Sequence, residues 1–291
     1  MEDAFARCHP AVNLLYFALV LTGTMLFWHP GCLLLSLGFG LAYWIRLAHW
    51  DVVRRRLRWM APLLVLTAAL NPLFSHVGDT VLAHLPTGSP LTLEAICFGL
   101  SAAVMLAAAL FWCFCGAQIL TTDRIVCLLG RPLPVLSLLL TMVLRFVPQL
   151  RRQMRQIALA QSQLPVPGRG LAARARRGAQ LCAALLSWSV ERAVITADSM
   201  KSRGYGLPGR SAYRPYRMER RDRALLAAEL AGAAVLGTGA AFGLLQWQYY
   251  PVCRGIWAGW PILAAYAALL ALPLLLNWKE DRAWRVWQSN T

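Results

Sequence analysis

Residues 145–161, RFVPQLRRQMRQIALAQ, and residues 191–206, ERAVITADSMKSRGYG, belong to one strongly basic stretch that runs from Arg145 to Arg223. This stretch carries 17 of the chain's 29 Lys and Arg residues and four acids, a local charge of +13 against +16 for the whole chain. A segment with this many cations cannot cross a bilayer, because each charge in the hydrocarbon is costly. The sequence on both sides of it is long and apolar. The stretch is therefore predicted to lie at the membrane surface, between two membrane-embedded blocks.

The composition of the whole chain supports a membrane protein. Of its 291 residues 58% are hydrophobic and only 14% are charged, whereas a soluble domain carries about a quarter of charged residues. Apolar runs of nearly 20 residues recur, the length that a helix needs to cross a bilayer. In a soluble protein a net charge of +16 would suggest nucleic acid. Here it is better explained by the Lys and Arg excess of cytoplasmic loops, so no nucleic-acid partner is expected.

Apolar runs divide the chain into three parts: an N-terminal membrane block at residues 1–120, a cytoplasmic region at 121–223 and a C-terminal membrane block at 224–291. The expected fold is an all-α polytopic membrane protein with about six spans, five and seven being the alternatives, and with long amphipathic helices between spans four and five. The expected spans are Val12–Trp28, Cys32–His49, Met60–Val77, Leu91–Leu120, Ala224–Tyr249 and Gly259–Trp278.

The distribution of charge predicts the orientation of these spans. Four arginines lie between Arg54 and Arg58, and Lys279, Arg282 and Arg285 lie in the tail, whereas the connector from Gly78 to Pro90 has no Lys or Arg. With the N- and C-termini both cytoplasmic, every dense basic cluster falls on the cytoplasmic side. The third span also contains the pair Asn71-Pro72, which predicts a break or a kink whose freed backbone groups are satisfied by neighbouring helices.

Two helices are predicted within the basic stretch. The first begins near Val135 and must end at the Pro- and Gly-rich segment Pro165–Gly168. Apolar residues follow one another along it at steps of three and four, which places them on one face. These residues are Val147, Leu150, Met154, Ile157, Ala160 and Leu164.

The second helix is predicted from about Leu171 to Arg203. Arg203 lies in its last turn, where a cation is stabilised by the helix dipole by roughly 0.3–1 kcal/mol, and Gly204 occupies the position of a C-cap glycine. A purely structural role for Arg203 is therefore one interpretation. The apolar stripe of this helix is Cys182, Leu186, Val190, Ala193, Ala197 and Met200.

Several short motifs, taken in order, resemble the transmembrane T component of energy-coupling factor (ECF) transporters. The motif with the strongest likeness is Ser199-Met200-Lys201-Ser202-Arg203-Gly204-Tyr205-Gly206, preceded by Glu191-Arg192-Ala193. In that family a short Ala-Arg-Gly-like motif ends a cytoplasmic coupling helix. The resemblance extends over about Pro10 to Gly206, and its other motifs are His9-Pro10, Asn71-Pro72, Leu91-Thr92-Leu93-Glu94, Thr121-Thr122-Asp123, Leu144-Arg145-Phe146-Val147-Pro148 and Ile157-Ala158-Leu159-Ala160-Gln161.

One departure from the family pattern concerns the first coupling helix. The family usually has a second Ala-Arg-Gly-like triplet shortly after the Ala-Gln pair, but this chain has Gln163-Leu164-Pro165 there. Arg169, in Gly168-Arg169-Gly170, is a candidate substitute, although prolines separate it from the helix. Only Ser202-Arg203-Gly204 carries the motif over intact.

The resemblance implies a coupling subunit of an ECF-type ABC importer in the plasma membrane of a bacterium or archaeon. Its implied partners are two cytoplasmic ABC-type ATPases and one membrane-embedded, substrate-binding S component, besides the lipid bilayer. Ser202, Arg203 and Gly204 would dock on the ATPases, because an Arg fork at a helix end can pair bidentately with carboxylates. The apolar residues that would pack beside this contact are Leu150, Met154, Ile157, Leu186, Val190, Ala197 and Met200.

The sequence also limits the chemistry of this chain. Neither of its lysines, Lys201 and Lys279, lies in a G-x-x-x-x-G-K-[ST] phosphate loop, so any ATP is expected to be bound by partner chains. We expect no cofactor, no metal site and no catalytic residues, and therefore no enzyme activity of the chain itself. The eight cysteines have no C-x-x-C spacing, and the five histidines are far apart.

Two other functions compete with that of a coupling subunit. A self-sufficient secondary transporter would need intramembrane ionisable residues and internal repeats, and a membrane-embedded enzyme would need carboxylates or His in the basic stretch. The transported substrate is not encoded in this chain if a separate subunit binds it. The resemblance implies a vitamin or a transition metal ion.

Overall fold

The structure is a computed structural model that describes residues 3–75, 78–84, 90–130, 132–163, 170–207, 216–243, 245, 247–251, 253–255 and 259–289. It forms two compact units, one made of residues 1–124 and 216–291 and the other of residues 125–215. We describe each unit by itself. The chain thus leaves the first unit after Arg124 and returns to it at Tyr216.

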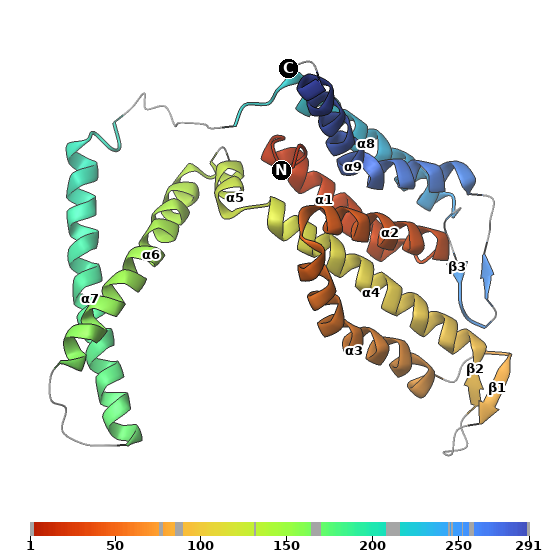
Figure 1. The fold of residues 1–291 in the computed structure, drawn as a ribbon, viewed down its shortest axis with the longest axis horizontal. Helices are drawn as coiled ribbons and strands as arrows, with labels where there is room; N and C mark the ends of the chain where they lie inside the picture. The colour runs from red at the N-terminus through yellow and green to blue at the C-terminus, as the bar shows by residue number, and fades with distance from the viewer. Residues whose placement is uncertain are drawn as a thin grey trace. The chain divides into compact units, whose positions relative to one another are not determined.

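The first unit is a bundle of six long apolar helices (Figure 1). Five of them are long and apolar enough to cross a membrane, and the sixth, α1, is an apolar helix of 17 residues. The all-α polytopic membrane fold expected from the sequence is therefore confirmed. The helices are α1 (Pro10–Leu26), α2 (Pro30–Leu47), α3 (Trp50–Phe74), α4 (Leu93–Ile119), α8 (Arg220–Ala241) and α9 (Trp260–Ser289).

Two short β-ribbons lie in the connections between helices of this unit. Strand β1 (Val81–His84) pairs antiparallel with β2 (Pro90–Thr92) ahead of α4, and β3 (Trp247–Gln248) pairs with β4 (Arg254–Gly255) between α8 and α9. The fifth predicted span was too long, because the helix ends at Ala241 and Gly243 adopts a positive φ of 69° that begins the turn.

Two other helix boundaries differ from those expected. Helix α3 begins at Trp50 instead of Met60, so the arginines at 54–58 lie within its first turns and not ahead of it. Helix α9 continues through the charged tail to Ser289, eleven residues past the expected end at Trp278. In both cases the helix extends past the apolar span into charged sequence, because Arg, Lys and Glu are good helix formers.

The first two helices begin in the same way. His9 and His29 precede Pro10 and Pro30, and each His side chain accepts a hydrogen bond from a backbone N–H two residues later, at 3.2 and 3.1 Å. The prolines occupy the first helical position, where no backbone N–H is needed. These two histidines therefore act as helix caps.

Helix α4 is central in the bundle and packs against α1, α2 and α3, while α9 packs against α2 and α8. A chain of buried polar groups joins four of these helices. Trp112 Nε1 donates to Ser36 Oγ (3.1 Å), and Thr24 Oγ1 lies 2.7 Å from Ser36 Oγ and 3.3 Å from the Tyr266 hydroxyl. Hydrogen bonds between helices stabilise a bundle in lipid, where no water competes for the polar groups.

Near Asn71-Pro72 the backbone of α3 lies close to α4. Pro72 has no N–H to bond the carbonyl of Ala68 one turn earlier, and this carbonyl faces Gly99 of α4. Asn71 Nδ2 donates to the carbonyl of Ala95 and to the Tyr250 hydroxyl, both at 2.8 Å. Helix α4 thus contacts α3 at the Asn71-Pro72 pair, and α3 continues without a break to Phe74; the kink stays a prediction.

We predict that Gly99→Ala destabilises this contact. A Cβ at Gly99 would lie 2.4 Å from the Ala68 carbonyl oxygen, a backbone atom that moves only if the helices separate. Overpacking of this kind costs about 1–3 kcal/mol, and thermal unfolding in detergent should show a melting temperature lower by several degrees. Gly38→Ala on α2 is the matched control, because nothing lies within 4 Å of its Cβ position. An equal melting temperature for Gly99→Ala and the control would contradict this packing.

The second unit contains two long helices, α6 (Pro134–Ser162) and α7 (Leu171–Ser202). The short helix α5 (Thr122–Leu129) spans the boundary between the two units. The predicted coupling helices, from about Val135 and from Leu171 to Arg203, agree with α6 and α7 to within one residue at both starts and at the end of α7. Helix α6 ends at Ser162, ahead of the predicted end at Pro165–Gly168, and that segment lies outside the described residues together with Leu164 of the predicted stripe.

Candidate functional site

The α6 and α7 helices cross each other within the second unit (Figure 1). The Phe146 ring of α6 stacks on the Trp188 ring of α7, with centroids 5.8 Å apart and ring planes at 21°. The Arg192 guanidinium lies 5.9 Å from the centre of the Trp188 ring, one helical turn further along α7. Aromatic stacking and a cation–π contact thus fix one point of the crossing.

Helix α7 has two apolar stripes, one half-buried and the other exposed among the described residues. Leu181, Leu185 and Trp188 follow one another at steps of four and three and are half-buried. The second stripe is the predicted one. Its last member, Met200, is half-buried, whereas the other five are exposed; we call these five residues the exposed stripe: Cys182, Leu186, Val190, Ala193 and Ala197. None of the α7 residues is fully buried.

The exposed stripe presents large apolar side chains at the surface of the second unit. Leu186 is 66% exposed and Val190 is 64% exposed. A contiguous apolar face of this kind on a soluble surface is a feature of interaction sites. The other predicted packing residues are Leu150, Ile157 and Met200, which are half-buried, and Met154, which is 41% exposed.

The C-terminal end of α7 is capped by the glycine that the sequence indicated. Gly204 has φ +72°, a conformation that L residues other than glycine rarely adopt. The Gly204 N–H donates to the Lys201 carbonyl at 2.9 Å, and the Tyr205 N–H donates to the Met200 carbonyl at 3.0 Å. These two bonds form a Schellman motif, which satisfies the last carbonyls of the helix. The predicted C-cap is thus confirmed.

The same motif positions Ser202 and Arg203. Ser202 is the last helical residue, and its hydroxyl donates to the Ser199 carbonyl at 2.9 Å. Arg203 is the C-cap residue, and its side chain is exposed. Within the part of the chain that the structure describes, Arg203 forms no ion pair. A fixed backbone therefore presents a guanidinium at the end of a helix that 32 residues make about 48 Å long.

We predict that Gly204→Ala loosens this end of α7. The positive φ is unfavourable for alanine by about 1–2 kcal/mol, and the new Cβ would lie 3.0 Å from Leu207 Cδ1. Amide hydrogen exchange in residues 199–207 should become about 5–30 times faster. Gly178→Ala, on the same helix with no atom near its Cβ position, is the control and should leave this exchange unchanged. Equal exchange in both variants would contradict the cap.

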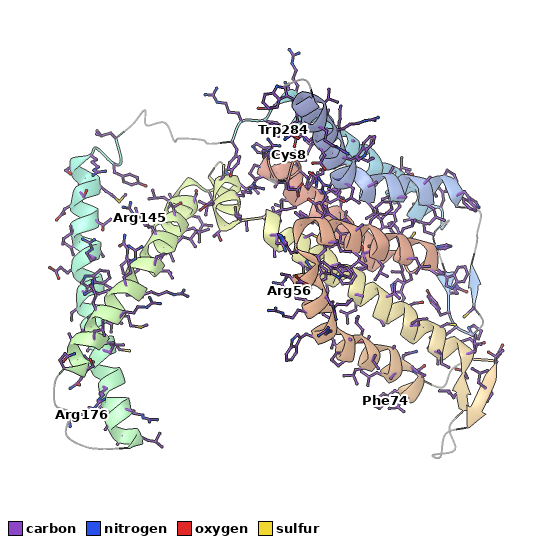
Figure 2. The ribbon with its side chains drawn as sticks, in the orientation of Figure 1. Cys8, Arg56, Phe74, Arg145, Arg176 and Trp284 are labelled. Atoms are coloured by element: carbon purple, nitrogen blue, oxygen red, sulfur yellow. The ribbon has the colours of Figure 1, made fainter. Side chains whose placement is uncertain are left out.

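As far as Gln163, the last residue described there, the end of α6 presents no cation in the way that α7 presents Arg203. Helix α6 ends at Ser162, with Gln163 as its C-cap residue, and contains Pro148. Arg169, the candidate substitute, lies outside the described residues. Figure 2 labels two arginines of these helices: Arg145 lies in the N-terminal half of α6, and Arg176 lies on α7 near the end opposite to Arg203.

The stacked pair Phe146 and Trp188 was not singled out from the sequence. The spacing of Leu181, Leu185 and Trp188 is the signal that could have revealed it, because these residues form a second apolar stripe at helical steps. Among the described residues no group of three or more His, Cys, Asp or Glu side chains gathers as a metal site would require.

Comparison with known families gives a match that covers most of the chain. The model of the family described as "CbiQ: Cobalt transport protein" matches residues 7–213. The match begins ahead of α1 and includes α6, α7 and the capped end of α7. No curated protein sequence matches the chain.

Proposed function

Because the chain belongs to the CbiQ cobalt transport protein family, and is therefore a membrane component of a transport system, we propose that it is the transmembrane coupling subunit, or T component, of an ECF-type ABC importer. The observation that carries the proposal is the capped end of α7. It presents Arg203 on a rigid helix whose exposed stripe is apolar. In this role the chain itself is not a catalyst.

The proposed partners on the cytoplasmic side are two ABC-type ATPases, which bind and hydrolyse the ATP. The Arg203 guanidinium pairs with carboxylates in a groove of the ATPase, and the exposed stripe packs beside it. A bidentate Arg–carboxylate pair fixes orientation as well as distance. When the ATPases close and reopen, α7 moves with them, and α6 follows through the Phe146–Trp188 contact.

The motion is proposed to reach a separate membrane protein, the S component, which binds the transported substrate. The description of the matched family as a cobalt transport protein favours a transition metal ion within the broader class of metal ions and vitamins. The cargo is therefore held by a different chain, and this chain couples its passage to ATP hydrolysis.

The charges of the first unit support an orientation with both termini in the cytoplasm of a bacterial or archaeal cell. Arg7, Arg46 and Arg221 form ion pairs with residues of the C-terminal part of α9, so the N-terminus and the end of α9 lie at the same end of the bundle (Figure 1). The positive-inside rule places a basic end of this kind in the cytoplasm.

Reconstitution tests this function. The chain is co-expressed with the ATPases and the candidate S component of its own organism, purified and placed in liposomes. ATP-dependent uptake of labelled cobalt or of the vitamin bound by the S component, lost when any one subunit is left out, is the expected result. Uptake by this chain alone, driven by an ion gradient, would instead identify a secondary transporter.

A further inference from the structure

The C-terminal part of α9 extends beyond the apolar span. Helix α9 has 30 residues and is about 45 Å long at 1.5 Å per residue, whereas the hydrocarbon core of a bilayer is about 30 Å thick. The apolar sequence ends at Trp278, and the helix then continues with Lys279, Glu280, Asp281 and Arg282. Its last three turns therefore lie at the level of the lipid headgroups or beyond.

The two acids of this segment are already paired inside the first unit. Glu280 forms ion pairs with Arg7 and with Arg221, the latter with nitrogen and oxygen 3.4 Å apart, and Asp281 pairs with Arg46. These partners come from the start of the chain, from α8 and from α2. The side of α9 that carries the acids thus faces the bundle, and its negative charge is neutralised there.

The opposite side carries cations and a tryptophan. Trp278, Arg282 and Arg285 are spaced by four and three residues, and Lys279 and Val286 flank them at helical steps of three and four from Arg282. All five side chains are exposed, and Trp278 is 54% exposed. We call these five residues the outer face of α9.

The outer face has cationic side chains that are available to bind an anion. The Arg282 guanidinium lies 5.0 Å from the centre of the Trp278 ring. Among the described residues none of Lys279, Arg282 and Arg285 forms an ion pair. A shallow hollow of about 470 Å³ is lined by Trp278, Arg282, Arg285 and Val286.

We propose that the outer face of α9 binds the headgroups of anionic phospholipids in the leaflet at this end of the bundle. Arg282 and Arg285 bind the phosphate, since a guanidinium is suited to phosphate oxygens. Trp278 lies at the boundary between the hydrocarbon and the headgroups, where Trp is enriched in membrane proteins. A soluble anion would use the cations but would gain nothing from the exposed tryptophan at membrane depth. The proposal requires that the bundle spans a membrane and is independent of the ATPase contact.

Binding of short-chain lipids to the full chain in detergent tests the proposal. The dissociation constants of short-chain phosphatidylglycerol, short-chain phosphatidylcholine and inorganic phosphate are measured by thermophoresis. With about fivefold per cation near an anionic surface, the wild-type chain should bind phosphatidylglycerol about 30-fold more tightly than phosphatidylcholine. Arg282→Gln together with Arg285→Gln should remove this preference, and Arg282→Gln alone should reduce it about fivefold.

The control variant is Arg174→Gln with Arg177→Gln, which removes the same charge from exposed positions on α7 and should keep the preference. An equal loss in the control would show that net charge alone is responsible, and would overturn the proposal. So would an absence of preference in the wild-type chain or its persistence in the Arg282→Gln, Arg285→Gln variant. Inorganic phosphate that binds as tightly as phosphatidylglycerol would assign the site to a soluble anion instead.

Discussion

Replacing Arg203 with glutamate is expected to abolish association with the ATPases while the chain stays folded in the membrane. Arg203 is exposed at the C-cap of α7 and forms no ion pair among the described residues, so its loss leaves no buried partner within the chain. In the complex the variant would place a carboxylate against carboxylates. Truncating one partner of a buried charge pair already costs about 2–5 kcal/mol, and charge reversal adds repulsion. Co-purification of the ATPases with the tagged chain is the measurement.

Arg176→Glu provides the control for this experiment. Arg176 is an exposed arginine of the same helix, near its N-terminal end (Figure 2), and its reversal changes the net charge by the same amount. The ATPases should co-purify with this variant nearly as well as with the wild-type chain. Normal stoichiometry of the ATPases with Arg203→Glu would refute the assigned role of Arg203.

Replacing Val190 with aspartate should weaken ATPase binding at least about 30-fold. Val190 is 64% exposed, so the folded chain loses little packing when it is changed. In the complex the same side chain is expected to be buried, and truncating a central contact of an interface costs about 2 kcal/mol or more. An unpaired carboxylate in an apolar contact adds a desolvation penalty. Binding of the purified ATPases to the chain in nanodiscs gives the affinity.

Ser187→Asp is the matched control for Val190→Asp. Ser187 is exposed on α7 one turn before Val190 and is not a member of the exposed stripe. It receives the same charge one turn away, and affinity should change by less than about threefold for a surface substitution. Equal losses for Ser187→Asp and Val190→Asp would mean that the exposed stripe has no special part in binding.

The apolar runs, together with the Gly and Pro residues that end helices, were sufficient to predict which segments form the long helices, but not all of their ends. The apolar runs gave the bundle because lipid requires backbone groups to bond within each segment. The Gly204 cap was also predictable, because a glycine directly after a helical pattern supplies the positive φ of a C-cap. The true ends of α3 and α9 were missed for a physical reason: hydropathy marks where a helix leaves the hydrocarbon, whereas helix propensity decides where it stops.

Contacts between helices were less predictable. Helix α7 has two apolar stripes, and periodicity alone does not say which of them packs against α6. The predicted stripe, with Leu186 and Val190, is the exposed one, and the half-buried stripe with Trp188 was overlooked. The pairing of Glu280 and Asp281 with Arg7, Arg221 and Arg46 joins residues more than 50 positions apart, which local spacing does not reveal. The ATPase contacts of Ser202, Arg203 and Gly204 remain predictions, as does the role of Arg169.

Photo-crosslinking from the exposed stripe tests the central claim most directly. Val190→p-benzoylphenylalanine is introduced into the full chain, which is co-expressed with its ATPases and irradiated in intact cells. The account predicts a covalent product between this chain and an ATPase, and a loss of that product when Arg203→Glu is combined with the probe. Crosslinks to lipid alone, or labelling of this position by a membrane-impermeant reagent applied outside the cell, would contradict it.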